Sequence, residues 1–143
     1  MELLEIICGK DTSPATLARS LAFGRAIKKT CVVVNDGYGF FTSRVFSSYI
    51  VEGAQLVAEG HDPVLVEWAA RTRGMVVPPL QVFDEVSLAL GKHATEQGAE
   101  YRGREILDAP GVKLMYKLVE LGRLGKVNGA GFYEYEGGKR KGF

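Results

Sequence analysis

Glu5 is the residue of this 143-residue chain whose surroundings point most directly to chemistry. It interrupts residues 3–7 (LLEII), an apolar run rich enough in leucine and isoleucine for a buried strand. An acid within such a strand costs free energy unless it is paired or functional. Two interpretations stay open: an acid at a solvated end of a sheet, or a carboxylate that orients a catalytic histidine.

Neither of the chain's two histidines is an obvious partner for Glu5. His61 follows a glycine that is expected to end a helix and is predicted to be exposed, whereas His93 lies in a helical stretch and is expected to be a surface or a packing residue. The two cysteines, Cys8 and Cys31, have no CxxC spacing, which argues against a metal site and against a disulfide framework. We expect buried free thiols in a reducing compartment, the cytoplasm.

The charge balance argues against two classes of partner. Eighteen basic and 17 acidic residues give a formal net charge of +1, so there is no electrostatic footprint for nucleic acid or for a membrane surface. No apolar run approaches the roughly 18 to 20 residues that a membrane-spanning helix needs. The composition, 46% hydrophobic and 24% charged, is that of an ordinary globular domain with its own core.

Two glycine-rich stretches could be mistaken for phosphate-binding loops. Residues 37–42 (GYGFFT) stand where a dinucleotide fingerprint would stand, but Thr42 replaces its third glycine, and no second strand ending in an acid follows. A turn that joins two domains and uses the backbone freedom of glycine is favoured. Residues 122–126 (GRLGK) lack the Ser or Thr that must follow the lysine, so loop closure with packing of Phe132 and Tyr133 is expected.

The first 35 residues predict one α/β element. The strand at residues 3–7 is followed by a helix that Ser13 caps and Pro14 begins, and then by a second strand at residues 31–34. From Phe40 onward the pattern is helical, so the boundary between two domains is expected near Gly37.

Helix signals divide the rest of the chain. A long helix ends at Gly60, Asp62-Pro63 begins another that runs to about Arg73, and Pro78-Pro79 begins a third. Further helices are predicted at residues 91–99 and 112–121, then a loop at 122–138 and a solvated basic end at 139–141. The third helix is expected to turn the following side chains inward: Leu80, Phe83, Val86 and Leu90.

Four separated stretches together resemble the 3-hydroxyacyl-CoA dehydrogenases. They are MELLEII, VVVNDGYGFFTSRVFSSYIVEGAQLVAEGHDP, DEVSLALGKHA and GRLGKVNGAGFYEY, in the family's order and over essentially the whole chain. The third resembles most the multifunctional α-chains of fatty-acid β-oxidation, which join enoyl-CoA hydratase and dehydrogenase parts. The resemblance implies a mainly α fold: residues 1–36 as a strand-helix-strand remnant of the NAD-binding Rossmann domain, and residues 37–143 as the all-helical C-terminal domain.

The resemblance also implies roles for three residues. MELLE matches the MxLxE end of the family signature HFFNPxxxMxLxE, so Glu5 corresponds to the glutamate that pairs with the catalytic histidine, which is expected upstream of Met1. Ser43 stands where single-function members carry an asparagine near the substrate. Lys126 stands one position before the basic residue of the terminal loop that reaches the cofactor in many members, a position that Val127 fills here.

By this resemblance the complete protein would oxidise (S)-3-hydroxyacyl-CoA to 3-ketoacyl-CoA with NAD, and this chain alone would be an inactive fragment. Its helical part would shape the acyl cleft and form a homodimer, and a hydratase domain or a thiolase partner would accompany it. A standalone, non-catalytic dimerisation or acyl-CoA-binding module is the alternative. A Rossmann-plus-helical dehydrogenase of other hydroxy acids is a weaker third, because it does not explain MxLxE and DEVSLALGKHA together.

Overall fold

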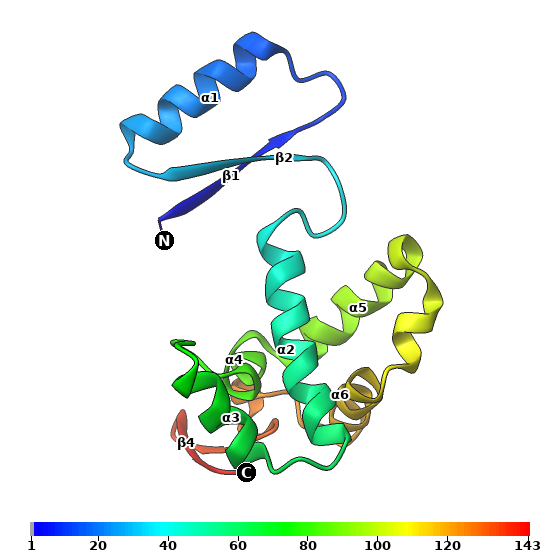
Figure 1. Cartoon of the computed structure of the whole chain (residues 1–143). Coiled ribbons are helices and arrows are strands. Elements are labelled where there is room, and N and C mark those ends of the chain that lie inside the picture. The colour runs from blue at the N-terminus through cyan, green and yellow to red at the C-terminus, as the bar shows by residue number, and fades with distance from the viewer. Residues whose placement is uncertain (1) are drawn as a thin grey trace. The chain divides into compact units, whose positions relative to one another are not determined.

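The structure, a computed structural model, describes residues 2–143 and consists of two compact units, Met1–Phe46 and Ser47–Phe143. The helix α2 (Thr42–Ala58) begins in the first unit and continues into the second. Helices dominate the described residues (Figure 1), which confirms the mainly α fold predicted from the sequence.

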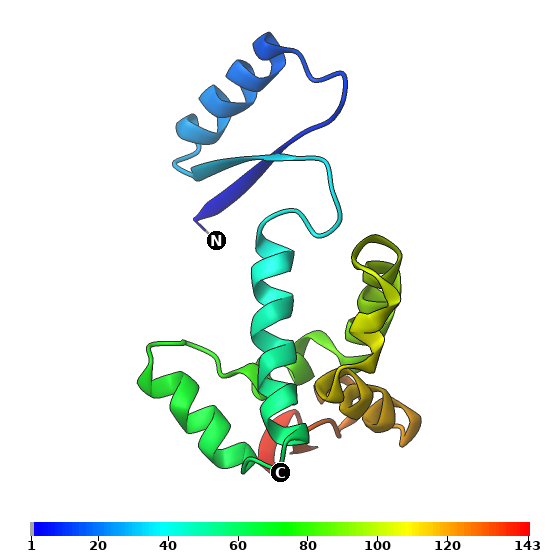
Figure 2. The ribbon, with the colours of Figure 1, turned by 45° about the vertical axis from the view of Figure 1, so that its right-hand side comes forward.

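The first unit is a parallel β-α-β element. Strand β1 (Leu3–Cys8) pairs in parallel with β2 (Thr30–Asn35), and α1 (Pro14–Ala26) makes the crossover and runs alongside both strands (Figure 2). The predicted cap is confirmed, because the Ser13 hydroxyl accepts a hydrogen bond from the Thr16 N–H at 3.1 Å. Helix and strands approach closely at Gly24, where a Cβ would lie 2.2 Å from Cys31 Sγ.

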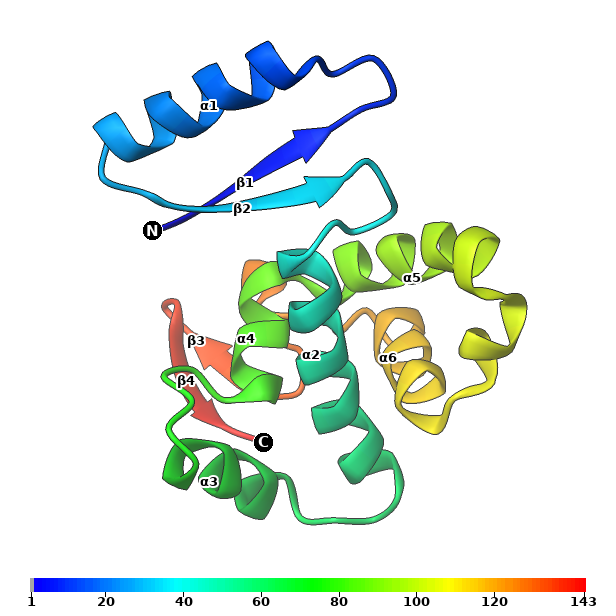
Figure 3. The same ribbon diagram turned by 45° about the horizontal axis from the view of Figure 1, so that its top comes forward.

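The second unit is helical and ends in a small hairpin (Figure 3). Its elements after α2 are α3 (Pro63–Thr72), α4 (Pro79–Val86), α5 (Leu88–Arg102), the 3₁₀ helix η1 (Arg104–Asp108), α6 (Pro110–Glu120), the 3₁₀ helix η2 (Lys126–Asn128), β3 (Glu134–Glu136) and β4 (Lys139–Gly142). Its core is built around side chains that are almost completely buried, among them Ala54, Leu80, Phe83, Leu88 and Met115.

Local signals placed several helix ends correctly. The Asp62 carboxylate accepts a hydrogen bond from the Val64 N–H at 2.7 Å and so caps α3. Gly60 follows α2 with φ +96°, a conformation that glycine adopts without strain. Pro79 begins α4, where its missing N–H leaves no helical hydrogen bond unmade.

The expectation that Leu90 turns inward was wrong. Ser87 adopts φ +80°, which ends α4 at Val86 and lets α5 begin at Leu88, earlier than predicted. The Leu88 N–H donates to the Leu124 carbonyl at 3.0 Å, and the Leu88 side chain is completely buried. Because this break resets the helical phase, Leu90 is 59% exposed.

The loop predicted at residues 122–138 contains the strand β3 and leads into β4, whereas the basic end at residues 139–141 is exposed, as predicted. Strands β3 and β4 pair antiparallel, with Tyr135 opposite Arg140. Gly137 and Gly138 connect them with φ +56° and +74°, the pair of positive φ values that tight hairpins use. The Arg140 guanidinium lies over the Tyr133 ring, 4.7 Å from its centroid, and donates to Gln81 Oε1 at 2.8 Å.

Helices α2 and α4 meet at Gly53, which makes Gly53→Ala a test of this packing. A Cβ there would lie 2.5 Å from Pro79 Cβ and 2.7 Å from Pro79 Cγ, two ring atoms that move only with the backbone. Overpacking outweighs the better helix propensity of alanine, so we expect the free energy of unfolding to fall by about 1–2 kcal/mol. Urea denaturation measures this free energy. The control is Glu52→Ala, at an exposed position of the same helix, which should change the free energy of unfolding by no more than about 0.5 kcal/mol. Equal effects of the two substitutions would contradict the close packing at Gly53.

Candidate active site

The Glu5 carboxylate is held at the start of α2. Its Oε1 accepts hydrogen bonds from the N–H groups of Phe41 and Thr42, at 2.7 and 3.0 Å. Its Oε2 accepts a hydrogen bond from the Thr42 hydroxyl at 2.8 Å. The half-buried Glu5 of β1 therefore caps α2, although this helix begins more than 30 residues later in the chain. Its carboxylate accepts from N–H groups at the helix start that a neighbouring capping side chain would otherwise satisfy.

This environment favours the ionised form of Glu5. The backbone N–H of Thr42 lowers the pKa of the Glu5 carboxyl most, followed by the Thr42 hydroxyl; desolvation opposes them, and the Phe41 N–H makes a smaller contribution that lowers the pKa. The positive end of the helix dipole acts in the same direction. Glu5 is thus a fixed negative charge at neutral pH, which is what a carboxylate that orients an imidazole must be.

An open hollow of about 550 Å³ lies in the same unit. It is lined by residues 33–37, which form the end of β2 and the turn after it, by Phe40 and Phe41 just before α2, and by Arg44 and Val45 in its first turn. Arg44 Nε donates to the Tyr38 carbonyl at 2.8 Å and so holds the turn against the helix. Ligands of open α/β sheets bind beyond the carboxyl ends of the strands, which is where this hollow lies.

The other predicted site residues lie at the surface. Ser43 is exposed in the first turn of α2, directly after Thr42. Lys126 is exposed at the start of η2 in the second unit. The structure brings Ser43, but not Lys126, into the unit that contains Glu5. The substrate contact of Ser43 and the cofactor contact of Lys126 stay predictions.

Both histidines of the chain are exposed residues of the second unit, which confirms the prediction for His61 and decides for the surface rather than packing at His93. His93 Nε2 lies 3.1 Å from the side-chain nitrogen of Gln97 on the same helix. The hydrogen bonds that the structure shows to Glu5 come from Phe41 and Thr42. Among residues 2–143, no group of three or more His, Cys, Asp or Glu side chains is placed to hold a metal ion, and no helix has the length and apolar character needed to cross a bilayer.

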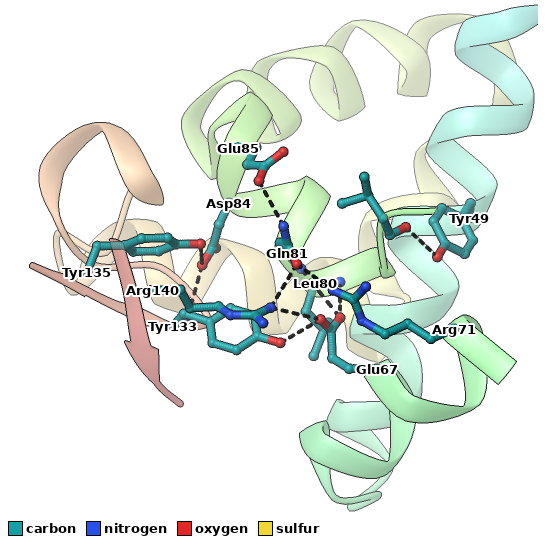
Figure 4. A network of polar contacts seen from close by, with 11 residues as sticks. Tyr49, Glu67, Arg71, Leu80, Gln81, Asp84, Glu85, Tyr133, Tyr135 and Arg140 are labelled. Carbon is teal, nitrogen blue, oxygen red and sulfur yellow. Dashed lines mark hydrogen bonds and ion pairs between the residues drawn. The ribbon is translucent and has the colours of Figure 1, made fainter. Parts of the chain in front are cut away.

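A pair of buried carboxylates, Glu67 and Asp84, lies in the helical unit (Figure 4). Asp84 is completely buried: its Oδ1 accepts from the Phe132 N–H at 2.8 Å, and its Oδ2 accepts from the Tyr133 N–H at 2.9 Å and the Tyr135 hydroxyl at 3.1 Å. Burial raises the pKa of Asp84, and these hydrogen bonds oppose the shift. The carboxylate thereby attaches the terminal segment to α4.

Glu67 makes the matching connection to α3. It accepts from the Leu80 N–H, at the start of α4, at 2.7 Å and from the Tyr133 hydroxyl at 2.5 Å. Burial, followed by the neighbouring Glu67, raises the pKa of Tyr133 well above its ordinary value. Glu67 and Asp84 are both satisfied by groups of the chain itself, so this cluster holds the fold together and is not a ligand site.

Thr42 and Asp84 make important contacts that were not predicted from the sequence. Asp84 lies four residues after Leu80, on the face of α4 already predicted to be buried, and an acid on such a face signals a buried hydrogen-bond network. Thr42 is a residue type that favours helix starts, but its pairing with Glu5 requires contact between segments 37 residues apart.

A parallel β-α-β element followed by a helical unit has the domain order of a two-domain dehydrogenase. Comparison with known families agrees: the model "3-hydroxyacyl-CoA dehydrogenase, C-terminal domain" matches residues 39–135, and "3-hydroxyacyl-CoA dehydrogenase, NAD binding domain" matches residues 1–37. The chain belongs to the 3-hydroxyacyl-CoA dehydrogenase family, as its sequence motifs indicated.

The relatives are longer than this chain. It is 35% identical over 145 residues to the fatty acid oxidation complex subunit alpha of Shewanella sp. (strain MR-7), a match that covers 98% of this chain and 19% of that protein. A matching protein of Shewanella oneidensis is 34% identical over 146 residues, covering 99% of this chain and 20% of its own length. The chain thus spans about a fifth of the curated relatives it matches.

Solved structures share the fold. The (S)-3-hydroxybutyryl-CoA dehydrogenase PaaH1 from Ralstonia eutropha is 26% identical with a TM-score of 0.82, over 95% of this chain and 48% of that one. A 3-hydroxybutyryl-CoA dehydrogenase from Escherichia coli K12 has a TM-score of 0.85 at 24% identity, over 100% of this chain and 30% of that one, a likeness of fold alone.

Proposed function

We propose that these residues are part of an NAD-dependent dehydrogenase that oxidises (S)-3-hydroxyacyl-CoA to 3-ketoacyl-CoA in fatty-acid β-oxidation. Membership in the family supports the reaction class. The observation that carries the proposal is the Glu5 carboxylate, ionised and fixed by three donors at the start of α2. One of those donors, Phe41, also lines the hollow beyond the end of β2.

In this proposal Glu5 acts through a histidine supplied by the rest of the NAD-binding domain. The Glu5 carboxylate accepts the imidazole N–H, selects the tautomer that takes up the substrate's hydroxyl proton, and stabilises the imidazolium that results. Bound NAD would supply the acceptor for the hydride that leaves the substrate carbon. The β-α-β element with its hollow beyond β2 fits the last part of a domain that holds such a dinucleotide.

The remaining roles follow from the same proposal. Residues 1–36 complete the NAD-binding domain and residues 37–143 form the domain that shapes the acyl cleft, with Ser43 toward the substrate and Lys126 toward the cofactor. Helix α3 exposes Val64, Leu65 and Trp68, which supports a homodimer formed through the helical unit. The name of the relatives, a subunit of a fatty acid oxidation complex, supports assembly with other parts of such a complex. We propose that these are a hydratase domain or a thiolase partner, and that the protein acts in the cytoplasm.

The test is NADH formation by the full-length protein that contains these residues. We expect absorbance at the NADH band to rise with (S)-3-hydroxybutyryl-CoA and not with its (R) enantiomer, and the 143-residue chain alone to be inactive. Turnover of acetoacetyl-CoA and NADH by the purified chain would contradict the proposed roles. Saturable acyl-CoA binding by the chain together with an inactive full-length protein would favour the non-catalytic binding module.

A further inference from the structure

Thr42 contacts Glu5 through its backbone and through its side chain. Its N–H shares Oε1 with the Phe41 N–H, whereas its hydroxyl bonds Oε2. The two carboxylate oxygens therefore have different surroundings. Oε1 has two donors, which fill its two lone pairs, and Oε2 has one donor and keeps one acceptor position.

Only the hydroxyl determines where that remaining acceptor position points. The two N–H groups hold Oε1 but leave the carboxylate able to rotate about the bond that carries it, since the terminal torsion of glutamate is broad. The hydrogen bond from the Thr42 hydroxyl to Oε2 stops this rotation and fixes the plane of the carboxylate. At 2.8 Å, the Thr42 hydroxyl lies at the ordinary distance for a strong O–H···O⁻ bond.

We infer that Thr42 is a positioning residue for Glu5: its hydroxyl fixes the carboxylate plane so that the remaining acceptor position of Oε2 receives the imidazole N–H of the catalytic histidine. This inference rests on the proposed function. It adds a residue from the first turn of α2 to the Glu5–histidine pair. It also separates two roles of Thr42. Its N–H, at the start of α2, is satisfied by the Glu5 carboxylate, which caps the helix, whereas its hydroxyl orients that carboxylate.

Thr42→Val tests the hydroxyl while it preserves shape and both backbone donors. In the full-length enzyme we expect kcat to fall about tenfold, because a misoriented orienting carboxylate weakens proton transfer, while KM for acyl-CoA and for NAD stays within about twofold. Thr42→Ser, which keeps the hydroxyl, should restore kcat to within about twofold. Thr72→Val is the matched control, since the Thr72 hydroxyl bonds only the Ala69 carbonyl within α3 and kcat should be unchanged.

A second measurement needs no turnover. A ¹³C NMR titration of the Glu5 carboxyl in the 143-residue chain should show a higher pKa in Thr42→Val than in wild type, because a bond to the charged form is lost, and a wild-type pKa in Thr42→Ser. Wild-type kcat in Thr42→Val, an equal loss in Thr42→Ser, or an unchanged Glu5 pKa would each overturn the inference.

Different results would overturn the proposed dehydrogenase function and the positioning role of Thr42. A full-length wild-type protein without NAD-dependent oxidation removes the proposed function, and the role of Thr42 toward a catalytic histidine is overturned with it. An active wild-type enzyme whose Thr42→Val variant is equally active overturns the role of Thr42 alone and leaves the proposed function standing.

Discussion

Replacing Glu5 with glutamine is expected to lower kcat of the full-length dehydrogenase by about 10³-fold, with little change in KM. The glutamine oxygen would take the place of Oε1 and accept from Phe41 and Thr42. The amide nitrogen would then replace Oε2 and point a donor at the imidazole N–H. A donor facing a donor cannot hold the imidazole or stabilise its protonated form.

Steady-state kinetics with (S)-3-hydroxybutyryl-CoA and NAD measure this effect. The melting temperature should stay near that of wild type, because the Thr42 hydroxyl can accept from the new amide and the helix start remains capped. Glu2→Gln, which changes an exposed acid next to the same strand, is the control and should leave kcat within about twofold of wild type. A Glu5→Gln variant with wild-type kcat would remove Glu5 from the mechanism.

Replacing Asp84 with alanine is expected to cost about 3–5 kcal/mol of the free energy of unfolding, a large share of the stability of a domain. The change leaves the buried N–H groups of Phe132 and Tyr133 without their acceptor, and it opens space where the side chain was completely buried. The terminal segment would lose its attachment to α4. Urea denaturation followed by circular dichroism measures the loss.

Two comparison variants make the result specific to this network. Tyr135→Phe removes one hydrogen bond to Asp84 and leaves both backbone donors satisfied, so a loss of about 1 kcal/mol is expected. Glu85→Ala, at the exposed neighbouring position of α4, should change stability by no more than about 0.5 kcal/mol. If Asp84→Ala were no more destabilising than Glu85→Ala, the network would not hold the terminal segment.

The sequence by itself determined the features that depend on a few neighbouring residues. Ser13 with Pro14 and Asp62 with Pro63 marked helix starts correctly, because a cap and its target are no more than three residues apart. Four short stretches, among them the motif around Glu5, likewise indicated the family, since each is a run of residue types at fixed spacing. These local signals do not depend on how the distant parts of the chain pack.

Only the tertiary structure decided what the acids do. The donors to Glu5 come from residues 36 and 37 positions away, and those to Asp84 from 48 to 51 positions away. No local pattern encodes such contacts, because they depend on which elements pack together and at what register. The same holds for the break at Ser87, where burial of Leu88 and its bond to Leu124 override the helical periodicity that had placed Leu90 in the core.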